Sequence, residues 1–439
     1  MSTKRSGSPL ALLGGPKTVT EPPGDLLAWP IITAEDEAAV LEVLRRGTMS
    51  ANDVSKQFEQ EMAAFFGTRY ALGSCNGTAS LQEAMWAIGL RAGDELIGPT
   101  LTYWATVLPA LSLGVSVVFA DVDRRTLCID PGDIERHIGP RTRAIVVTHV
   151  CGHPCDMDSI MAIARRHGLK VIEDVSHAQG ALYKGRLLGT IGDVGAMSLM
   201  SGKSLPCGEA GMLVTNDRAI WERAIAFGFY ERNGVSRFTA AGSEVTDPGL
   251  QRLAGVPLSG AKHRMHQLSA AVGRVQLKHY PARMAEIQKA MNFFWDCLRD
   301  TPGVREHRVD PKSGSTMGGW YFANGHYVPE ELGGLPVERF VQAVTAEGVS
   351  LSSWFYKPLH LHPVFHEADI FGHGRPTNIA FAERDVRQGP GSLPAAESLL
   401  GRTLCIPWFK HYRPDVIGQC AEALRKVSRH AEELLEAKP

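Results

Sequence analysis

The stretch KVIEDVSHAQG, residues 170–180, is the part of this sequence that decides its fold. Lys170 to Glu173 is a short run of β-branched and apolar residues, which is typical of a buried strand. Asp174 follows at once, so a carboxylate lies at the carboxyl end of that strand. In parallel sheets covered by helices, the carboxyl ends of the strands form the edge at which ligands bind.

The sequence before this strand extends the same architecture. Two more β-branched runs, Ser116 to Ala120 and Ala144 to Thr148, precede it. Between the second run and the strand, an apolar stripe at helical spacing ends at Gly168, a helix stop signal. Strands that alternate with amphipathic helices predict an α/β fold with a mostly parallel, doubly wound sheet.

The length of the chain and a change in its residue pattern indicate more than one domain. At 439 residues it is too long for one ordinary core. After about residue 275 a long helical stretch from Leu277 leads to Pro-rich and Gly-rich connections and to a last helix from Pro414 to Glu436. We predict an N-terminal arm at 1–24, a large domain at 25–275 and a smaller C-terminal α+β domain at 276–439.

Composition limits the partners of the protein. The formal net charge is -1, so no broad basic field is available to hold nucleic acid or an anionic membrane. No run approaches the ~20 apolar residues that span a bilayer. The eight cysteines lack the spacing of a disulfide scaffold, which fits free thiols in a reducing cytosol. We expect a cytoplasmic protein that acts on a small molecule.

One cluster of metal-binding residue types has two interpretations. His149, Cys151, His153 and Cys155 place four possible zinc ligands within seven residues. A second ligand pair at a suitable spacing is absent, and the glycine and proline between these residues are typical of the turn after a strand. We therefore expect a turn and no metal.

Lys203 has an unusual setting for a solvated ammonium group. It lies among small, apolar and glycine residues, with no lysine or arginine in the ten positions before it. A partly desolvated lysine has a lowered pKa and becomes a neutral amine nucleophile, which a covalent bond to an aldehyde cofactor requires. The alternative is structural, with the lysine capping a turn while its stem packs.

A phosphate cradle is the second candidate feature. Asn76 to Ser80 directly precedes an apolar helical face that starts at Leu81. Backbone N–H groups at such a helix start, together with the hydroxyls of Thr78 and Ser80, can hold a phosphate at the positive end of the helix dipole. An ordinary N-cap uses the same residue types, so that interpretation stays open.

Three more residues have two interpretations each. Asp174 can hold a protonated ring nitrogen of a cofactor that acts as an electron sink, or it can cap the following turn. Tyr103, next to Trp104, can stack on a flat ring or fill the core. His177 can contact a cofactor or be a satisfied histidine of the core.

Along the chain these features follow one another as a phosphate cradle, an aromatic plate, an acidic strand end and then a lysine. In this order the chain resembles the DegT family of sugar aminotransferases. These are fold-type I enzymes that depend on pyridoxal 5'-phosphate (PLP). The resemblance covers nearly the whole chain. Its motifs here are Asn76 to Ala79, Pro99 to Tyr103, Glu173 to Gly180, Ser198 to Met212, Tyr356 to His360 and Leu393 to Glu397.

The resemblance implies a role for each matching residue. Lys203 binds PLP covalently and later moves a proton between substrate and cofactor. Asp174 pairs with the pyridine nitrogen, and Tyr103 stacks on the ring. The remaining implied contacts are to the phosphate, from Thr78, Ala79 and Ser198, and to the side of the phenolic oxygen, from His177.

The resemblance also implies a homodimer with shared active sites. In this family a second subunit contributes a segment that matches Gly260 to Met265 here. The chain departs from the pattern in this region, because the family has asparagine where Lys262 stands and an acidic residue where Gln267 stands, and His266 is not typical. Lys262 can meet the phosphate as a cation, or it can face outward.

The activity implied by the resemblance is transamination, in which glutamine or glutamate supplies an amino group to a keto sugar or keto-cyclitol. Gly14 to Lys17 and Ala28 to Pro30 are more similar to the branch that acts on inosose-type cyclitols with glutamine, typically in antibiotic biosynthesis. Two alternatives stay open: a PLP dehydratase similar to aminohydroxybenzoate synthase, and a PLP-binding regulatory protein without turnover. PLP sugar dehydratases have histidine in place of Lys203, which argues against that activity.

The substrate contacts have competing interpretations as well. Arg232 and Arg264 can bind a donor carboxylate or a nucleotide phosphate, or they can form ion pairs. His266 and Tyr356 are further candidates. Tyr356, with Trp354, can wall the substrate pocket or fill the core.

Overall fold

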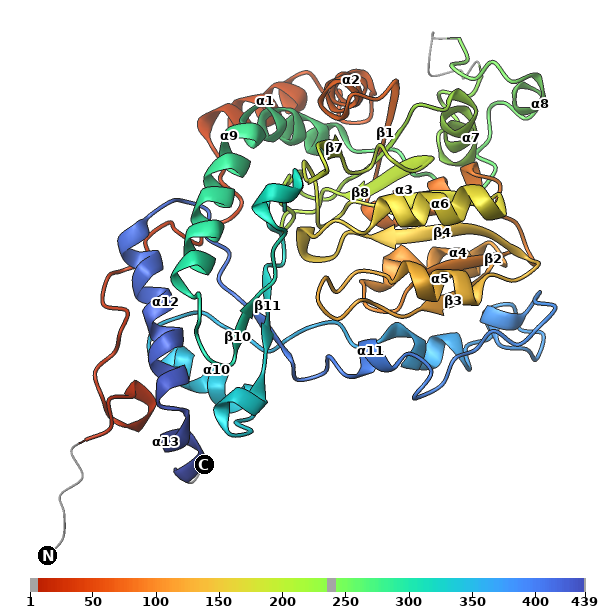
Figure 1. Ribbon diagram of the computed structural model, residues 1–439. Coiled ribbons are helices and arrows are strands. Elements are labelled where there is room, and N and C mark those ends of the chain that lie inside the picture. Colours follow the sequence, from red (N-terminus) through yellow and green to blue (C-terminus); the bar gives the residue numbers. More distant parts are fainter. Residues whose placement is uncertain (1–6, 235–241, 438–439) are drawn as a thin grey trace, which may run out of the picture.

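The computed structural model describes residues 7–234 and 242–437 (Figure 1). Within them, seven strands form the central sheet in the order β1-β9-β8-β5-β4-β2-β3. β9 is antiparallel to β1 and β8, and the neighbouring pairs from β8 to β3 are parallel. This confirms the predicted mostly parallel sheet. The bounds are β1 Tyr70–Ser74, β2 Glu95–Pro99, β3 Ser116–Ala120, β4 Thr142–Thr148, β5 Lys170–Asp174, β8 Val194–Ser198 and β9 Gly211–Thr215.

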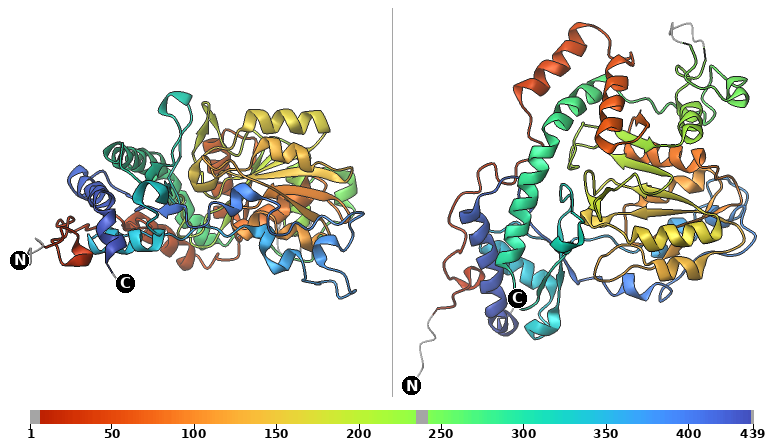
Figure 2. Two further views of the ribbon diagram at one scale, coloured as in Figure 1. Left: turned by 60° about the horizontal axis from the view of Figure 1, so that its bottom comes forward. Right: turned by 45° about the horizontal axis from the view of Figure 1, so that its top comes forward.

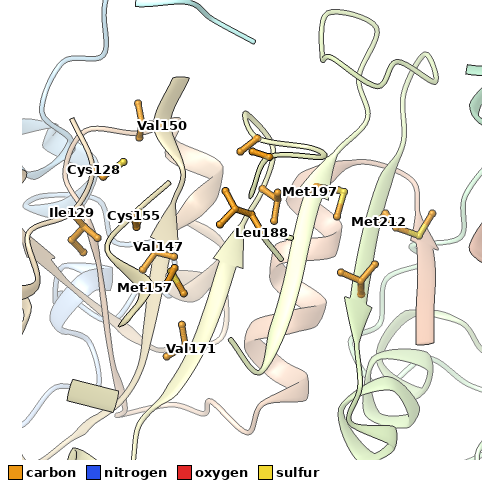
Figure 3. Packing of buried hydrophobic residues seen from close by; sticks show 14 of the residues in the cluster. Cys128, Ile129, Val147, Val150, Cys155, Met157, Val171, Leu188, Met197 and Met212 are labelled. Atoms are coloured by element: carbon orange, nitrogen blue, oxygen red, sulfur yellow. The ribbon is translucent and has the colours of Figure 1, made fainter. Parts of the chain in front are cut away.

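Helices cover both faces of the sheet. Alternate residues of each strand therefore pack into two different cores. In β4, Ala144 and Val146 face one core, whereas Ile145 and Val147 face the other, part of which Figure 3 shows. Strands buried on both faces explain the unbroken apolar runs in the sequence. The first core includes α3 (Gly77–Ala87), α4 (Pro109–Ser112) and α7 (Arg218–Gly228), and the second includes α2 (Asp53–Phe66), α5 (Pro131–His137) and α6 (Met157–His167).

One long helix links the two parts of the molecule. α9 (Gln267–Cys297) begins before the predicted start at Leu277, because His266 caps it by accepting the N–H of Leu268. Its first half packs beside α1 (Ala34–Arg45) and α2, and its second half enters a separate core from Ile287 onward. Figure 1 shows α9 running from α1 and α2 to α12.

The separate core belongs to a smaller α+β part (Figure 2). Three strands of the described chain form its antiparallel sheet. The last helix, predicted as one unit from Pro414 to Glu436, is two helices, because the backbone leaves helical geometry at His430. The elements are β10 Val304–Glu306, β11 Asn324–Tyr327, β12 Thr403–Cys405, α10 Val337–Ala346, α12 Pro414–Arg429 and α13 Ala431–Glu436.

The chain crosses between the two parts more than once. Leu10 and Leu26, in the predicted N-terminal arm and just beyond it, are buried in the core of the smaller part. Phe365 and Leu393, placed by the prediction in the C-terminal domain, are buried against the central sheet. The domain limits at residues 24 and 275 stay a prediction, and any division of this fold must account for these crossings.

The remaining elements are short. They are β6 Leu182–Tyr183, β7 Arg186–Leu187, α8 Pro248–Gln251, α11 Pro394–Glu397 and 3₁₀ turns at Ala11–Leu13, Trp104–Thr106, Val150–Gly152, Pro311–Ser313, Pro329–Leu332, Leu359–Leu361, Pro363–Phe365 and Thr377–Ile379. All eight cysteines lie in the described part of the chain as free thiols. No helix within residues 7–234 and 242–437 combines the length and apolar character needed to cross a membrane.

Candidate active site

The central strands bring several of the predicted residues to one edge of the sheet. Asp174 ends β5 and is paired in register with Thr148, the last residue of β4. Ser198 ends β8 and pairs with Gly211, which in turn pairs with Ser74 at the end of β1. The candidate site is therefore built on rigid strand ends.

The start of α3 lies directly against Ser198. A methyl group placed on Gly77 would lie 2.6 Å from Ser198 Cβ, so only glycine allows this approach. Asn76 caps the helix, with its Oδ1 accepting the N–H of Ala79 at 2.9 Å. The N–H groups of Gly77 and Thr78 have no partner within the helix. Asn76 therefore acts as an N-cap, and the N–H groups of Gly77 and Thr78 remain available as hydrogen-bond donors to an anion.

Asp174 is buried and supported by hydroxyl groups. Thr106 Oγ1 donates to Asp174 Oδ2 at 2.7 Å, and the backbone N–H of Ser176 donates to Oδ1 at 3.0 Å. The hydroxyl of Thr106 lies 2.8 Å from that of Thr102 and 3.2 Å from that of Thr148. Each carboxylate oxygen keeps acceptor capacity for another donor, such as a protonated ring nitrogen.

We expect Thr106→Val to weaken binding of a cofactor that uses Asp174 by about tenfold, because Asp174 Oδ2 loses a buried charge-assisted hydrogen bond. Thr106→Ser keeps the hydroxyl and should restore binding. A titration of the apoprotein with PLP, followed by absorbance, measures the effect. Equal weakening by valine and serine would contradict a role for the hydroxyl.

Lys203 is 8% exposed, and its amine lies 4.0 Å from the centre of the Tyr321 ring. Among the residues that the structure describes, none accepts a hydrogen bond from this amine. Burial lowers the pKa of Lys203 to about 8, although the negative charge of Asp174 opposes the shift. The indole of Trp29 donates to the Lys203 carbonyl at 2.9 Å, which holds the backbone of this loop.

The lowered pKa of Lys203 predicts how reaction with an aldehyde depends on pH. Only the neutral amine is a nucleophile, and its fraction rises as the pH increases through about 8. The rate at which the apoprotein combines with PLP should rise from pH 6 and level off above pH 8–9, measured by rapid-mixing absorbance. A rate that still climbs tenfold per unit beyond pH 9 would indicate an ordinary lysine, with a pKa near 10.4.

His177 is fully enclosed by polar and aromatic neighbours. Its Nδ1 accepts the backbone N–H of Cys151 at 3.3 Å, and its Nε2 lies 3.2 Å from the hydroxyl of Tyr356. The ring of Tyr321 meets it edge-on, with the ring centres 4.9 Å apart. Burial, followed by the nearby charge of Lys203, lowers the pKa of His177 well below its usual value. The imidazole is therefore neutral.

The cluster from His149 to Cys155 is a turn with its own hydrogen bonds. His149 Nδ1 accepts the N–H of Cys155 at 3.1 Å, and Nε2 lies 3.2 Å from the carboxylate of Glu173. Both ring nitrogens of His149 are therefore engaged. In the two described stretches of chain, no group of three or more His, Cys, Asp or Glu side chains is arranged to hold a metal ion.

Tyr356 is one of the residues that line a groove with a volume of about 790 Å³. Its lining includes Tyr103, Trp104, Trp354 and Lys357. Tyr103 is half exposed, with its ring 4.9 Å from that of Trp104, and it lies close enough to Tyr321 and Tyr356 to help raise their pKa. Tyr103, which was predicted to stack on the cofactor ring, therefore lines the same groove as Trp354 and Tyr356, which were predicted to wall the substrate pocket.

The predicted arginines have ion-pair partners. Arg232 is 6% exposed and donates to Glu59 at 2.8 Å and to Glu244 at 2.8 Å. The structure thus shows the alternative interpretation of Arg232 as an ion-pair residue, with the guanidinium held between two carboxylates. Arg264 lies 3.7 Å from Glu231 and is 19% exposed.

Lys262 and His266 are exposed. The amine of Lys262 lies 5.9 Å from the centre of the Tyr230 ring. Their segment runs beside the end of β1, where the N–H of Cys75 donates to the carbonyl of His263 and Ser74 forms a bridge with Arg264. Their predicted contacts with cofactor or substrate therefore remain predictions.

Sequence reasoning did not identify three parts of the site: Thr106, Tyr321 and the backbone of Cys151. Thr102 and Thr106 are four positions apart, but Thr102 precedes the 3₁₀ turn at Trp104–Thr106, so no helical periodicity pairs them in the sequence. No sequence pattern around Tyr321 predicts its place in the site. It contacts Lys203 and His177 only because segments far apart in the sequence pack together.

The residues present fit a phosphorylated aldehyde that contains a ring nitrogen. Lys203 offers a buried amine with a lowered pKa, and Asp174 offers a buried carboxylate at a strand end. The helix start at Gly77 lies beside Ser198, and the Ser80 hydroxyl is buried without a partner among the described residues. Amine, carboxylate and anion cradle match the three functional parts of PLP.

Comparisons with known proteins agree with this chemistry. The model of the DegT/DnrJ/EryC1/StrS aminotransferase family matches residues 30–425. The spore coat polysaccharide biosynthesis protein SpsC of Bacillus subtilis (strain 168) is 32% identical over 408 residues, 92% of this chain and 97% of that protein. A putative L-glutamine:3-amino-2,3-dideoxy-scyllo-inosose aminotransferase of Micromonospora echinospora is 32% identical over 364 residues, 81% of this chain and 82% of its own.

Solved structures share the whole fold. The aminotransferase from Psychrobacter cryohalolentis is 27% identical, with a TM-score of 0.78 over 92% of this chain and 99% of its own. The family match spans most of the sequence, and the site offers the groups that PLP requires. The chain therefore belongs to the DegT/DnrJ/EryC1/StrS aminotransferase family, whose members act with pyridoxal phosphate.

Proposed function

We propose that this enzyme transfers an amino group from glutamine or glutamate to a keto sugar or keto-cyclitol, in the biosynthesis of a secondary metabolite such as an antibiotic. The observation that carries the proposal is the buried amine of Lys203, with its pKa lowered to about 8, near the carboxylate of Asp174. The relative from Micromonospora echinospora supports a cyclitol acceptor and glutamine as donor, because its name includes both.

PLP, when bound, supplies an aldehyde and an electron-withdrawing ring through which an amino group passes from one carbon to another. The residues of this chain set the conditions for that exchange. Lys203 Nζ would hold the aldehyde and, once released as the free amine, would move a proton at the substrate carbon. Asp174 would keep a positive charge on the ring nitrogen, and Thr106 holds that carboxylate in place. Ser198 and the start of α3 would hold the phosphate.

We also propose a homodimer in which the segment from Gly260 to Met265 serves the site of the second subunit. Lys262 is exposed on this segment, so its amine is available to a partner. His263 anchors the segment, because its Nδ1 lies 3.0 Å from the buried carboxylate of Glu83. This anchoring supports a fixed position for Lys262 as a cation near the partner's phosphate group. Arg264, His266 and Tyr356 are the substrate contacts that we propose.

The decisive experiment separates the donor half of the reaction from the acceptor half. The PLP-loaded enzyme is mixed with glutamine or glutamate, without acceptor, and its visible spectrum is recorded. Loss of the absorption band of the bound aldehyde and growth of the amine form support transamination, and the faster donor identifies the branch. A band that neither donor changes would contradict the proposal and favour dehydration or a noncatalytic role.

A further inference from the structure

A strained turn next to the site has no role in the chemistry described so far. Cys151 is buried and has φ 56°, in the left-handed region that disfavours side chains. The next residue, Gly152, has φ 86°, and a methyl group there would lie 2.5 Å from the carbonyl oxygen of Met317. Strain of this kind persists where the surroundings enforce it and is concentrated at functional sites. Here the turn directs the N–H of Cys151 at His177.

This backbone contact fixes the tautomer of His177. Nδ1 accepts the N–H of Cys151, so it carries no hydrogen. The imidazole is neutral, because burial and the charge of Lys203 both disfavour the protonated form. The single ring hydrogen must therefore be on Nε2, which lies 3.2 Å from the hydroxyl of Tyr356. His177 donates, and the oxygen of Tyr356 accepts.

The direction of this bond leaves the hydrogen of the Tyr356 hydroxyl available. Burial raises the pKa of Tyr356 well above its usual value, so the phenol keeps its hydrogen at all working pH values. Within residues 7–234 and 242–437, no acceptor for that hydrogen lies within hydrogen-bond distance. Tyr356 lines the groove of about 790 Å³ with Tyr103 and two indoles, those of Trp104 and Trp354.

We propose that Tyr356 determines acceptor specificity, donating a hydrogen bond from its hydroxyl to an oxygen of a polyhydroxylated ring ketone. This inference rests on the proposed aminotransferase function and names a residue that acts in the acceptor half-reaction. The relay runs from the N–H of Cys151 through His177 to Tyr356 and ends on the substrate. The indoles of Trp104 and Trp354 offer apolar faces to the C–H side of such a ring.

The test is Tyr356→Phe, which removes the hydroxyl and keeps the ring. The two half-reactions are measured separately, with glutamine as donor and scyllo-inosose as a keto-cyclitol acceptor. We expect kcat/KM for the acceptor to fall about 10- to 100-fold. The donor half-reaction and the spectrum of the bound cofactor should stay unchanged. Binding of myo-inositol, a cyclitol without a ketone, should weaken by a similar factor in calorimetry.

One control variant makes the result specific. Tyr183→Phe removes another tyrosine hydroxyl, which donates to Asp156 outside the site, and should leave both half-reactions unchanged.

Other outcomes distinguish failure of this inference from failure of the proposed function. If Tyr356→Phe changes the cofactor spectrum and slows both halves equally, the hydroxyl serves the cofactor and the inference is wrong. Unchanged acceptor kinetics and unchanged myo-inositol binding also overturn it. A wild-type enzyme that reacts with no donor, yet binds myo-inositol more tightly than Tyr356→Phe, overturns the proposed function, and of the inference only the hydrogen bond from Tyr356 to a ring oxygen remains.

Discussion

Lys203→Ala should lower steady-state transamination by roughly 10⁴-fold or more, because it removes both the nucleophile and the group that moves the proton. The fold should survive. Burial outweighs the attraction of Asp174 and lowers the pKa of this lysine, so the ammonium form is destabilised on balance in the folded protein and its removal costs little stability. PLP should remain bound through its phosphate contacts, without a covalent bond.

Lys410 offers a matched control for this variant. It is also buried, and burial lowers its pKa to about 7. Its amine, however, donates to the carbonyl of Trp408 and lies 3.7 Å from the centre of that ring. We expect Lys410→Met to retain most of the turnover and the covalent bond to PLP, which borohydride reduction followed by mass spectrometry detects. Turnover retained in Lys203→Ala would disprove the assignment.

The contrast between these two lysines shows why position matters more than pKa alone. Lys203 faces the carboxyl ends of the central strands, where Asp174 and Ser198 also lie. The alternation of apolar runs and helices predicts that edge from sequence, because parallel strands bring their last residues together. The sequence pattern therefore predicts Asp174 at that edge, whereas Ser198 was assigned to the site only through the family resemblance.

Contacts between residues far apart in sequence could not be predicted in this way. Arg232 has ion-pair partners at Glu59 and Glu244, and nothing local in the sequence assigns Glu59 to it. Similarly, the direction of the bond from His177 to Tyr356 depends on a backbone angle at Cys151. Sequence patterns report periodicity and local turns, whereas these contacts arise only when separate elements pack.

The helix boundaries differ from the prediction for a related reason. α9 starts at Gln267, where the side chain accepts the N–H of Ser55 at 2.8 Å and is buried beside α2. A buried glutamine breaks the apolar periodicity that the prediction followed. The departure from the family pattern at Gln267 thus has a local explanation, in which the amide bonds to α2.

Asp174→Asn should slow both half-reactions by about 10²- to 10⁴-fold. Removing one partner of a buried charge pair costs about 3–5 kcal/mol, and each 1.4 kcal/mol is roughly a tenfold change in rate. Asparagine keeps the shape and can still accept the hydrogen bond from Thr106, so the fold should remain intact. The cofactor should also absorb at a different wavelength, because its ring nitrogen loses the charged partner.

Asp121→Asn provides the comparison that isolates this effect. Asp121 also follows a parallel strand and is buried, but its carboxylate accepts the N–H groups of Ala395 and Ala396. Its replacement should lower thermal stability and leave the cofactor spectrum unchanged. If Asp174→Asn kept normal rates and an unshifted spectrum, the ring nitrogen would have another partner. If both variants shifted the spectrum alike, the effect would come from general loosening of the sheet edge rather than from a charge at the cofactor.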